Sequence, residues 1–189
     1  MKSIGVFCGS SLGCEAAYTE QARKLGEALA RQNISLVFGG SNIGLMGVVA
    51  GAVMDNSGYA IGVIPRLIHA MVSHRPLSEE YIVKDMHERK ALMYSLADAF
   101  IILPGGLGTM EEFLEAFTWN QLGYHLKPIG ILDINNFFAP LLKFLQHMVA
   151  EGFCRQEQLD TLVIDTHPGR LLEKLGRVEL KPTPKHSRK

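Results

Sequence analysis

The chain has 189 residues, 47% hydrophobic and 20% charged, which is the composition of a globular protein able to bury a core. Lysine plus arginine and aspartate plus glutamate each number 19, so the formal net charge is zero. That balance argues against a protein that binds nucleic acid through bulk positive charge. It leaves open the binding of one small phosphate group by local contacts.

The number and spacing of cysteines and histidines indicate which metal sites and disulfides to expect. Three cysteines with no C-x-x-C pair predict neither a disulfide scaffold nor a structural zinc site. The seven histidines show neither H-x-x-x-H nor H-E-x-x-H spacing, so we expect no metal. The first residues lack the pattern of a secretory signal, and no apolar run is long enough to span a membrane. We therefore expect a cytoplasmic protein without membrane or nucleic-acid partners.

Short apolar runs alternate with stretches of helical periodicity along almost the whole chain. The expected strands are Ser3–Cys8, Ser35–Phe38, Tyr59–Ile64, Tyr81–Val83, Ala99–Leu103, Ile129–Leu132 and Thr161–Ile164, and the expected helices are 15–32, 45–56, 86–97, 109–122, 137–150 and 168–176. Several strands are continuously apolar, as in sheets covered on both faces. The alternation predicts a Rossmann-like α/β fold, an open parallel sheet of about seven strands with helices on both faces.

No internal repeat and no linker rich in proline or serine divides the chain. We therefore expect one nucleotide-binding domain over residues 1–180. Residues 181–189 are polar, basic and contain two prolines, which predicts a flexible tail.

Three glycine-rich turns follow expected strands, at 8–11, 39–47 and 104–106. In an open parallel sheet such strand-to-helix turns share the carboxyl edge, where ligands bind. Glycine allows a backbone to approach a ligand closely, although each turn alone could simply need glycine to be tight. The candidate binding residues of the first two turns are Gly9, Ser10, Gly40 and Met46.

The third turn leads from a buried strand into a helix that we expect to begin near Thr109. Free N–H groups at a helix N-terminus form an anion site. The candidate phosphate-binding residues are Gly105, Gly106, Leu107, Gly108, Thr109, Met110 and Glu111. The competing interpretation is a capping box with Thr109 as N-cap and Glu112 as its partner, but it does not explain the three glycines.

Two standard nucleotide motifs are missing. The third turn is not a Walker loop, because no Gly-Lys-Ser/Thr closes it. No G-x-G-x-x-G follows the first strand. The ligand that these turns favour is a mononucleotide rather than NAD.

The helix expected at 86–97 carries an arginine on its apolar face. Met86 and Met93 are spaced seven residues apart, and Arg89 falls between them in the same stripe. A guanidinium on a buried face must be paired or lie in a cleft. We favour a functional cleft over an ion pair that only locks the fold. Lys90, at the edge of the stripe, could reach either a phosphate or solvent.

Two motifs together resemble those of a known family. The sequence P-G-G-x-G-T-x-x-E stands at 104–112, and a helix motif ending in Arg-Lys stands at 86–90. The chain resembles the Lonely Guy family, the cytokinin riboside 5′-monophosphate phosphoribohydrolases, whose members have often been labelled lysine decarboxylases. The likeness runs over nearly the whole chain in the same order. It departs from the family at Ser41, where glycine is usual, and at residues 66–80.

The resemblance implies hydrolysis of the N-glycosidic bond of an adenine-type nucleoside 5′-monophosphate, either a cytokinin riboside 5′-monophosphate or AMP. The products would be the free base and ribose 5-phosphate. Glu112 would stabilise the positive charge on the ribose and activate water. Arg89 would either keep that glutamate ionised and in place or bind the ribose hydroxyls and the phosphate. The resemblance also implies a homodimer and no metal or organic cofactor.

Two other functions compete with hydrolysis. A lysine decarboxylase would need pyridoxal phosphate on a lysine, for which Lys90 or Lys127 could be proposed, and one small domain leaves little room for it. A non-catalytic nucleotide or cofactor carrier would need only the phosphate loop. The combination of Glu112 with Arg89 favours the enzyme.

Overall fold

The computed structural model of the chain describes residues 1–73 and 75–180, so the predicted tail at 181–189 lies outside the described residues. The strands are β1 (Ser3–Phe7), β2 (Ser35–Phe38), β3 (Ala60–Pro65), β4 (Glu79–Val83), β5 (Ala99–Ile102), β6 (Ile129–Leu132) and β7 (Leu162–Asp165). The helices are α1 (Ala16–Arg31), α2 (Gly44–Asp55), α3 (Arg66–His69), α4 (Met86–Leu96), α5 (Leu107–Leu122), α6 (Ala139–Ala150), α7 (Gln156–Leu159) and α8 (Pro168–Leu175).

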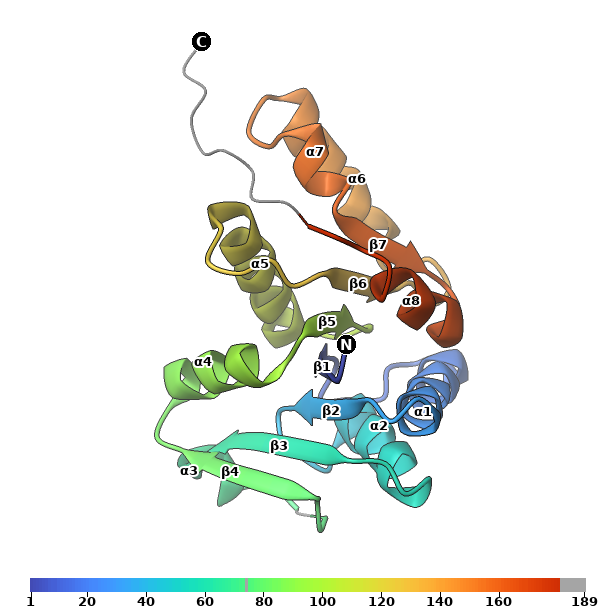
Figure 1. Cartoon of the computed structure of the whole chain (residues 1–189), viewed down its shortest axis with the longest axis vertical. Helices are drawn as coiled ribbons and strands as arrows, with labels where there is room; N and C mark the ends of the chain where they lie inside the picture. Colours follow the sequence, from blue (N-terminus) through green and yellow to red (C-terminus); the bar gives the residue numbers. More distant parts are fainter. Residues whose placement is uncertain (74, 181–189) are drawn as a thin grey trace.

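The strands form one seven-stranded sheet in the order β4-β3-β2-β1-β5-β6-β7, and every pairing is parallel. Helices α1, α2 and α8 pack on one face, while α4 and α5 pack on the other (Figure 1). The predicted fold is therefore confirmed, including the strand count and the coverage of both faces.

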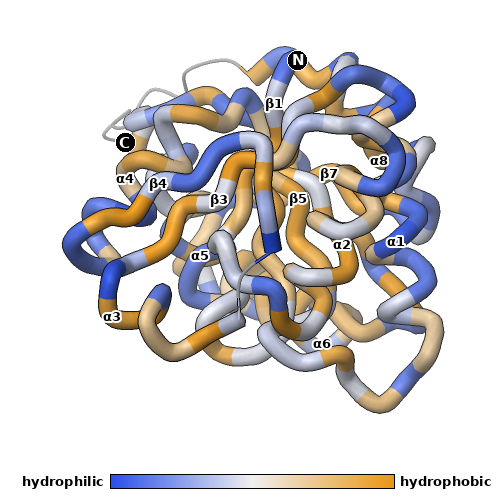
Figure 2. The backbone as a smooth tube through the Cα atoms, turned by 90° about the horizontal axis from the view of Figure 1, so that it is seen from below, coloured by the Kyte–Doolittle hydropathy of each residue, from blue (hydrophilic) through white to orange (hydrophobic). Residues whose placement is uncertain are grey.

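Alternate residues of each central strand supply two separate apolar clusters, one on each face of the sheet. On β2, Leu36 and Phe38 belong to the cluster under α1 and α2, whereas Val37 belongs to the cluster under α4 and α5. The apolar colour of β3 and β5 in the interior reflects this double burial (Figure 2). The outer strand β4 exposes three of its five residues, because it lies at the edge of the sheet.

The order of strands changes direction between β1 and β5. The chain runs outward from β1 to β4, then crosses back to place β5 on the other side of β1. In open parallel sheets, the position where the strand order reverses carries the ligand-binding crevice at the carboxyl edge. The N–H of Gly9 donates to the carbonyl of Pro104 at 3.0 Å, and the N–H of Leu45 donates to Gly9 at 3.0 Å. The three glycine-rich turns thus meet, as predicted.

Helix α5 begins two residues earlier than the sequence indicates. Gly106 is its N-cap and no side chain caps it, so Thr109 is the third helical residue. The capping-box interpretation is therefore wrong, since Thr109 and Glu112 lie inside the helix. The short helices α3 and α7 were not expected, because four residues are too few to show helical periodicity. Among the described residues, no helix is long and apolar enough to cross a membrane.

Candidate active site

The N-terminus of α5 lies in the crevice at the carboxyl ends of β1 and β5. Its first internal hydrogen bond runs from the N–H of Met110 to the carbonyl of Gly106 at 3.1 Å. The N–H groups of Leu107, Gly108 and Thr109 precede that bond, so they have no partner within the helix. This helix end presents donors and positive dipole to an anion.

Glycine at position 105 is required by the close approach of the helix to the loop. A β-carbon there would collide with the side-chain oxygen of Thr109 and lie 2.8 Å from the backbone nitrogen of Gly9. The absent side chain lets the Thr109 hydroxyl sit against the loop backbone. Gly105 therefore brings together the turns that follow β1 and β5.

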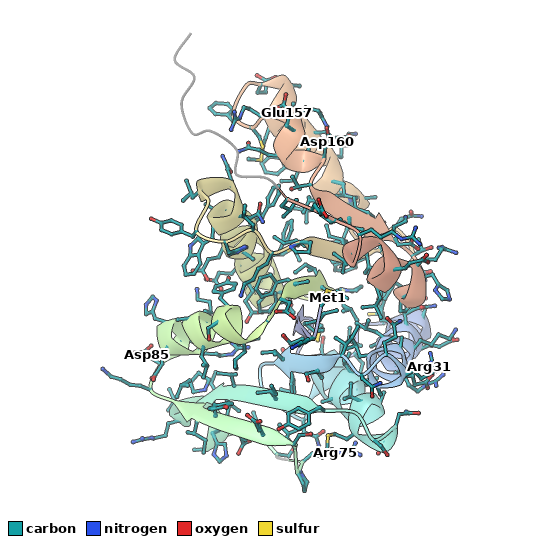
Figure 3. All side chains as sticks on the ribbon, viewed as in Figure 1. Met1, Arg31, Arg75, Asp85, Glu157 and Asp160 are labelled. Carbon is teal, nitrogen blue, oxygen red and sulfur yellow. The ribbon has the colours of Figure 1, made fainter. Side chains whose placement is uncertain are left out.

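Helix α4 is started by Asp85, whose carboxylate accepts from the N–H groups of His87 and Glu88 at 3.0 Å each. Asp85 is labelled in Figure 3, where the chain leaves β4 and enters α4. An N-cap of this kind fixes the first residue of a helix and hence the direction of each side chain. The cap therefore helps to turn Arg89 toward the sheet.

Arg89 and Glu112 form a nearly buried ion pair between α4 and α5. Arg89 Nη2 lies 3.1 Å from Glu112 Oε1, and the two side chains are only 11% and 9% exposed. Arg89 Nε is buried without a hydrogen-bond partner among the described residues. The structure thus brings together the two residues that the sequence analysis assigned to catalysis, and it leaves part of the guanidinium unsatisfied.

Gly39, the first residue after β2, makes room for that guanidinium. A β-carbon at position 39 would collide with Arg89 Nη2 and lie 3.2 Å from Met46 Sδ. Sequence reasoning placed a glycine-rich turn here but selected Gly40 as the ligand contact. The signal that could have found Gly39 is its position directly at the end of a buried strand.

A pocket of about 220 Å³ opens around the pair, lined by Cys8, Ser10, Met46, Arg89, Gly106, Leu107, Gly108, Thr109 and Glu112. Sequence reasoning predicts all of these residues except Cys8. Burial raises the pKa of the Cys8 thiol well above its usual range, with a further contribution from Glu112. The thiol is therefore neutral and gives the pocket an apolar wall.

Burial raises the pKa of Glu112 to about 6, and Arg89 opposes that rise while Glu111 and Glu115 add to it. Glu112 is therefore ionised at pH 7, yet basic enough to accept a proton near neutrality. The free helix N-terminus and the guanidinium can hold a phosphate. The buried carboxylate can stabilise developing positive charge in the same pocket.

Comparison with known proteins identifies the family of the chain. The family model described as "Possible lysine decarboxylase" matches residues 46–175. A cytokinin riboside 5′-monophosphate phosphoribohydrolase of Rhodococcoides fascians is 47% identical over 154 residues, 80% of this chain and 78% of that protein. The chain belongs to the Lonely Guy family. The Arabidopsis thaliana member with the same name, LOG1, is 44% identical over 175 residues, 92% of this chain and 82% of its own.

Among solved structures, the fold of this Lonely Guy protein is similar to that of a molybdenum cofactor binding protein from Rippkaea orientalis. The TM-score is 0.69 at 20% identity, and the match covers 93% of this chain and 95% of the other. At that identity the likeness concerns the fold alone.

Six residues predicted to bind substrate do not line the pocket of this Lonely Guy protein: Gly9, Gly40, Lys90, Gly105, Met110 and Glu111. Gly9 and Gly105 shape the meeting loops. Gly40 has a φ of +75°, so it serves a sharp turn that favours glycine. Met110 packs against the apolar cluster under α4 and α5.

The two lysines that could be proposed to carry pyridoxal phosphate have other partners. Lys90 Nζ lies 2.5 Å from Glu111 and 2.9 Å from Glu115. Lys127 Nζ donates to the carbonyl of Tyr94. Neither lysine lines the pocket, so the site offers no support for a decarboxylase of that type. Within residues 1–73 and 75–180, no cluster of three His, Cys, Asp or Glu residues could hold a metal ion.

Proposed function

We propose that the protein hydrolyses the N-glycosidic bond of an adenine-type nucleoside 5′-monophosphate and releases the free base and ribose 5-phosphate. The observation that carries this proposal is the Arg89–Glu112 ion pair, 3.1 Å long, in one pocket with the free N-terminus of α5. The names of the R. fascians and A. thaliana relatives, both phosphoribohydrolases, support the same reaction.

The 5′-phosphate binds at the N-terminus of α5. The N–H groups of residues 107–109 donate to its oxygens, and the hydroxyls of Ser10 and Thr109 line the same pocket. Because the phosphate does not react, its binding energy is available to align the glycosidic bond. Lys90, held by two glutamates, is not needed for that contact.

The bond between ribose C1′ and the base nitrogen breaks with its electron pair going to the base. Positive charge builds on the ribose, and the Glu112 carboxylate stabilises it. Glu112 also takes a proton from the attacking water as the water oxygen bonds to C1′. That proton passes through solvent to the departing base, which restores the Glu112 carboxylate. Arg89 favours the ionised form of Glu112 and orients it.

We include both AMP and cytokinin nucleotides in the substrate class. The R. fascians relative is named for cytokinin riboside 5′-monophosphate. A second pocket of about 210 Å³, with Leu12, Tyr18 and Phe137 in its walls, adjoins the first at Gly106. A panel that compares AMP with isopentenyladenosine monophosphate measures the preference directly.

We further propose a homodimer in the cytoplasm. Leu122 and Tyr124, which lie close together at the end of α5, are 38% and 75% exposed, and contiguous exposed apolar surface marks an interaction site. The three cysteines are free, as is usual in a reducing compartment. Sedimentation at several protein concentrations measures the assembly.

The test of the reaction is incubation with AMP and measurement of free adenine and ribose 5-phosphate. The competing function is a carrier, for which the fold of the R. orientalis cofactor-binding protein is a precedent. A carrier would bind AMP and release no base. The hydrolase releases both products in equal amounts.

A further inference from the structure

A cluster of four side chains joins α4 to α5 next to the proposed catalytic pair. Lys90 Nζ lies 2.5 Å from Glu111 Oε1 and 2.9 Å from Glu115 Oε1. Tyr94, one turn further along α4, donates its hydroxyl to Glu115 Oε2 at 2.9 Å. Both carboxylate oxygens of Glu115 are therefore held by side chains of α4.

Three of the four side chains are largely buried. The Lys90 side chain is only 9% exposed and that of Glu115 is 23% exposed, whereas that of Glu111 is 54% exposed. Tyr94 is packed among rings, with centroids 4.8 Å from Trp119 and 5.2 Å from Phe100. A buried ammonium must be paired, and removal of one partner from a buried ion pair is strongly unfavourable. These contacts therefore restrict α4 to one position relative to α5.

The same two helices carry the proposed catalytic pair in matching register. Arg89 directly precedes Lys90 on α4. Glu112 lies three residues before Glu115, so the two glutamates are neighbours on the surface of α5. A shift of α4 that breaks the Lys90–Glu115 contact also changes the 3.1 Å separation in the catalytic pair. Displacements of about 1 Å can reduce a reaction rate by roughly 10²-fold.

We propose that Glu115 is a positioning residue for nucleotide hydrolysis. It holds α4 against α5 through Lys90 and Tyr94, and this contact sets Arg89 against Glu112. Glu115 does not line the pocket, so it acts without touching substrate. The inference rests on the proposed function, because it takes Glu112 as the reacting carboxylate.

The pKa of Glu112 gives the role a distinctive signature. The charged and titratable groups that act on Glu112 are Arg89, Lys90 and Tyr94 from α4, Glu111 and Glu115 from α5, and Cys8 just after β1. Arg89 lowers the pKa of Glu112 by more than Glu115 raises it. Loss of the contact that holds Arg89 in place therefore raises that pKa further, an effect that a residue with no influence on the pair would not produce.

The experiment compares three variants of the full-length protein with AMP as substrate. For Glu115→Gln we expect kcat to fall by about 10- to 100-fold, with KM changed by less than about threefold. The acidic limb of the pH profile should move to higher pH, because the weakened Arg89 contact outweighs the lost charge of Glu115. Glu115→Asp keeps the charge but loses reach, so kcat falls and the limb again moves to higher pH. Tyr94→Phe removes one of the two contacts, so both changes are smaller.

Glu27→Gln is the matched control. Glu27 lies on α1, is ion-paired to Arg23 and has a side chain 23% exposed, as Glu115 has. We expect wild-type kcat and an unshifted pH profile for this control. Circular dichroism of all variants reports folding, and Glu115→Asp with Tyr94→Phe test the proposal if Glu115→Gln does not fold.

A carbon-13 NMR titration of the Glu112 carboxyl gives a readout that needs no turnover. We expect Glu112 to titrate at higher pH in Glu115→Asp than in the wild type. Wild-type kcat in Glu115→Gln and Glu115→Asp, or an unchanged Glu112 titration in Glu115→Asp, overturns the proposal. If the wild-type protein releases no base, the proposed function fails on its own, and the NMR result still decides whether Glu115 acts on Glu112.

Discussion

The guanidinium of Arg89 occupies the space that a β-carbon on residue 39 would need. Gly39 directly follows β2 and Arg89 comes from α4, so this contact joins the sheet edge to the helix that carries the arginine. Glu112 binds the same guanidinium at 3.1 Å. Gly39 therefore controls the geometry of the catalytic pair, although it is far from both residues in the sequence.

Substitution Gly39→Ala is expected to displace Arg89 and lower kcat for AMP by roughly 10- to 100-fold, since small misplacements of catalytic groups are costly. The protein should remain folded, because the clash involves a flexible side chain. Steady-state kinetics measure the loss. Gly176→Ala is the control, because an added β-carbon there makes only ordinary contacts at 3.5 Å. Equal activity of the two variants would contradict a role for Gly39.

The sequence predicts the strands and the position of the three turns on one edge of the sheet, because both depend on local pattern and on the rules of parallel sheets. It could not predict which glycine meets Arg89, since that depends on how closely α4 packs on β2. It also placed the start of α5 at Thr109. The helix starts earlier because Gly106 can serve as N-cap without a side-chain hydrogen bond.

The partner of Lys90 also cannot be predicted from the sequence. The sequence allows either a phosphate or solvent as the partner of Lys90, but the structure gives Lys90 two glutamates, at 2.5 and 2.9 Å. Helical periodicity indicates which face of a helix is buried, yet it carries no information on which charges of two helices meet. The Arg89–Glu112 contact was expected only because the motif pair suggested a shared site.

Neutralisation of the reacting carboxylate should stop turnover and spare binding. We expect Glu112→Gln to reduce kcat for AMP by about 10²- to 10⁴-fold, the usual contribution of a positioned general base. The phosphate contacts at α5 remain, so the Kd for AMP should change little. Calorimetry and product assays measure the two quantities. Glu157→Gln, on the exposed surface of α7, should behave as wild type; activity surviving in Glu112→Gln would exclude Glu112 as the base.

The pH profile should report Glu112. Its pKa is raised to about 6, and the reaction needs the ionised form, so kcat/KM should fall as the pH drops through about 6. Arg89 lowers the pKa of Glu112. Its removal in Arg89→Gln raises that pKa, and the acidic limb should therefore move to higher pH. A limb that stays in place in this variant would mean that the titrating group is not Glu112.

Thr109→Val tests the phosphate contact, since valine keeps the shape of threonine and removes the hydroxyl. Hydrogen bonds to charged groups contribute about 1.5–3 kcal/mol, so AMP should bind roughly 10- to 100-fold more weakly. Adenosine, which lacks the phosphate, should bind the variant and the wild type equally. Calorimetry with both ligands measures the difference, and Thr19→Val on α1 serves as the control. Equal losses for AMP and adenosine would show that Thr109 contacts another part of the nucleotide, because only a contact with the phosphate distinguishes the two ligands.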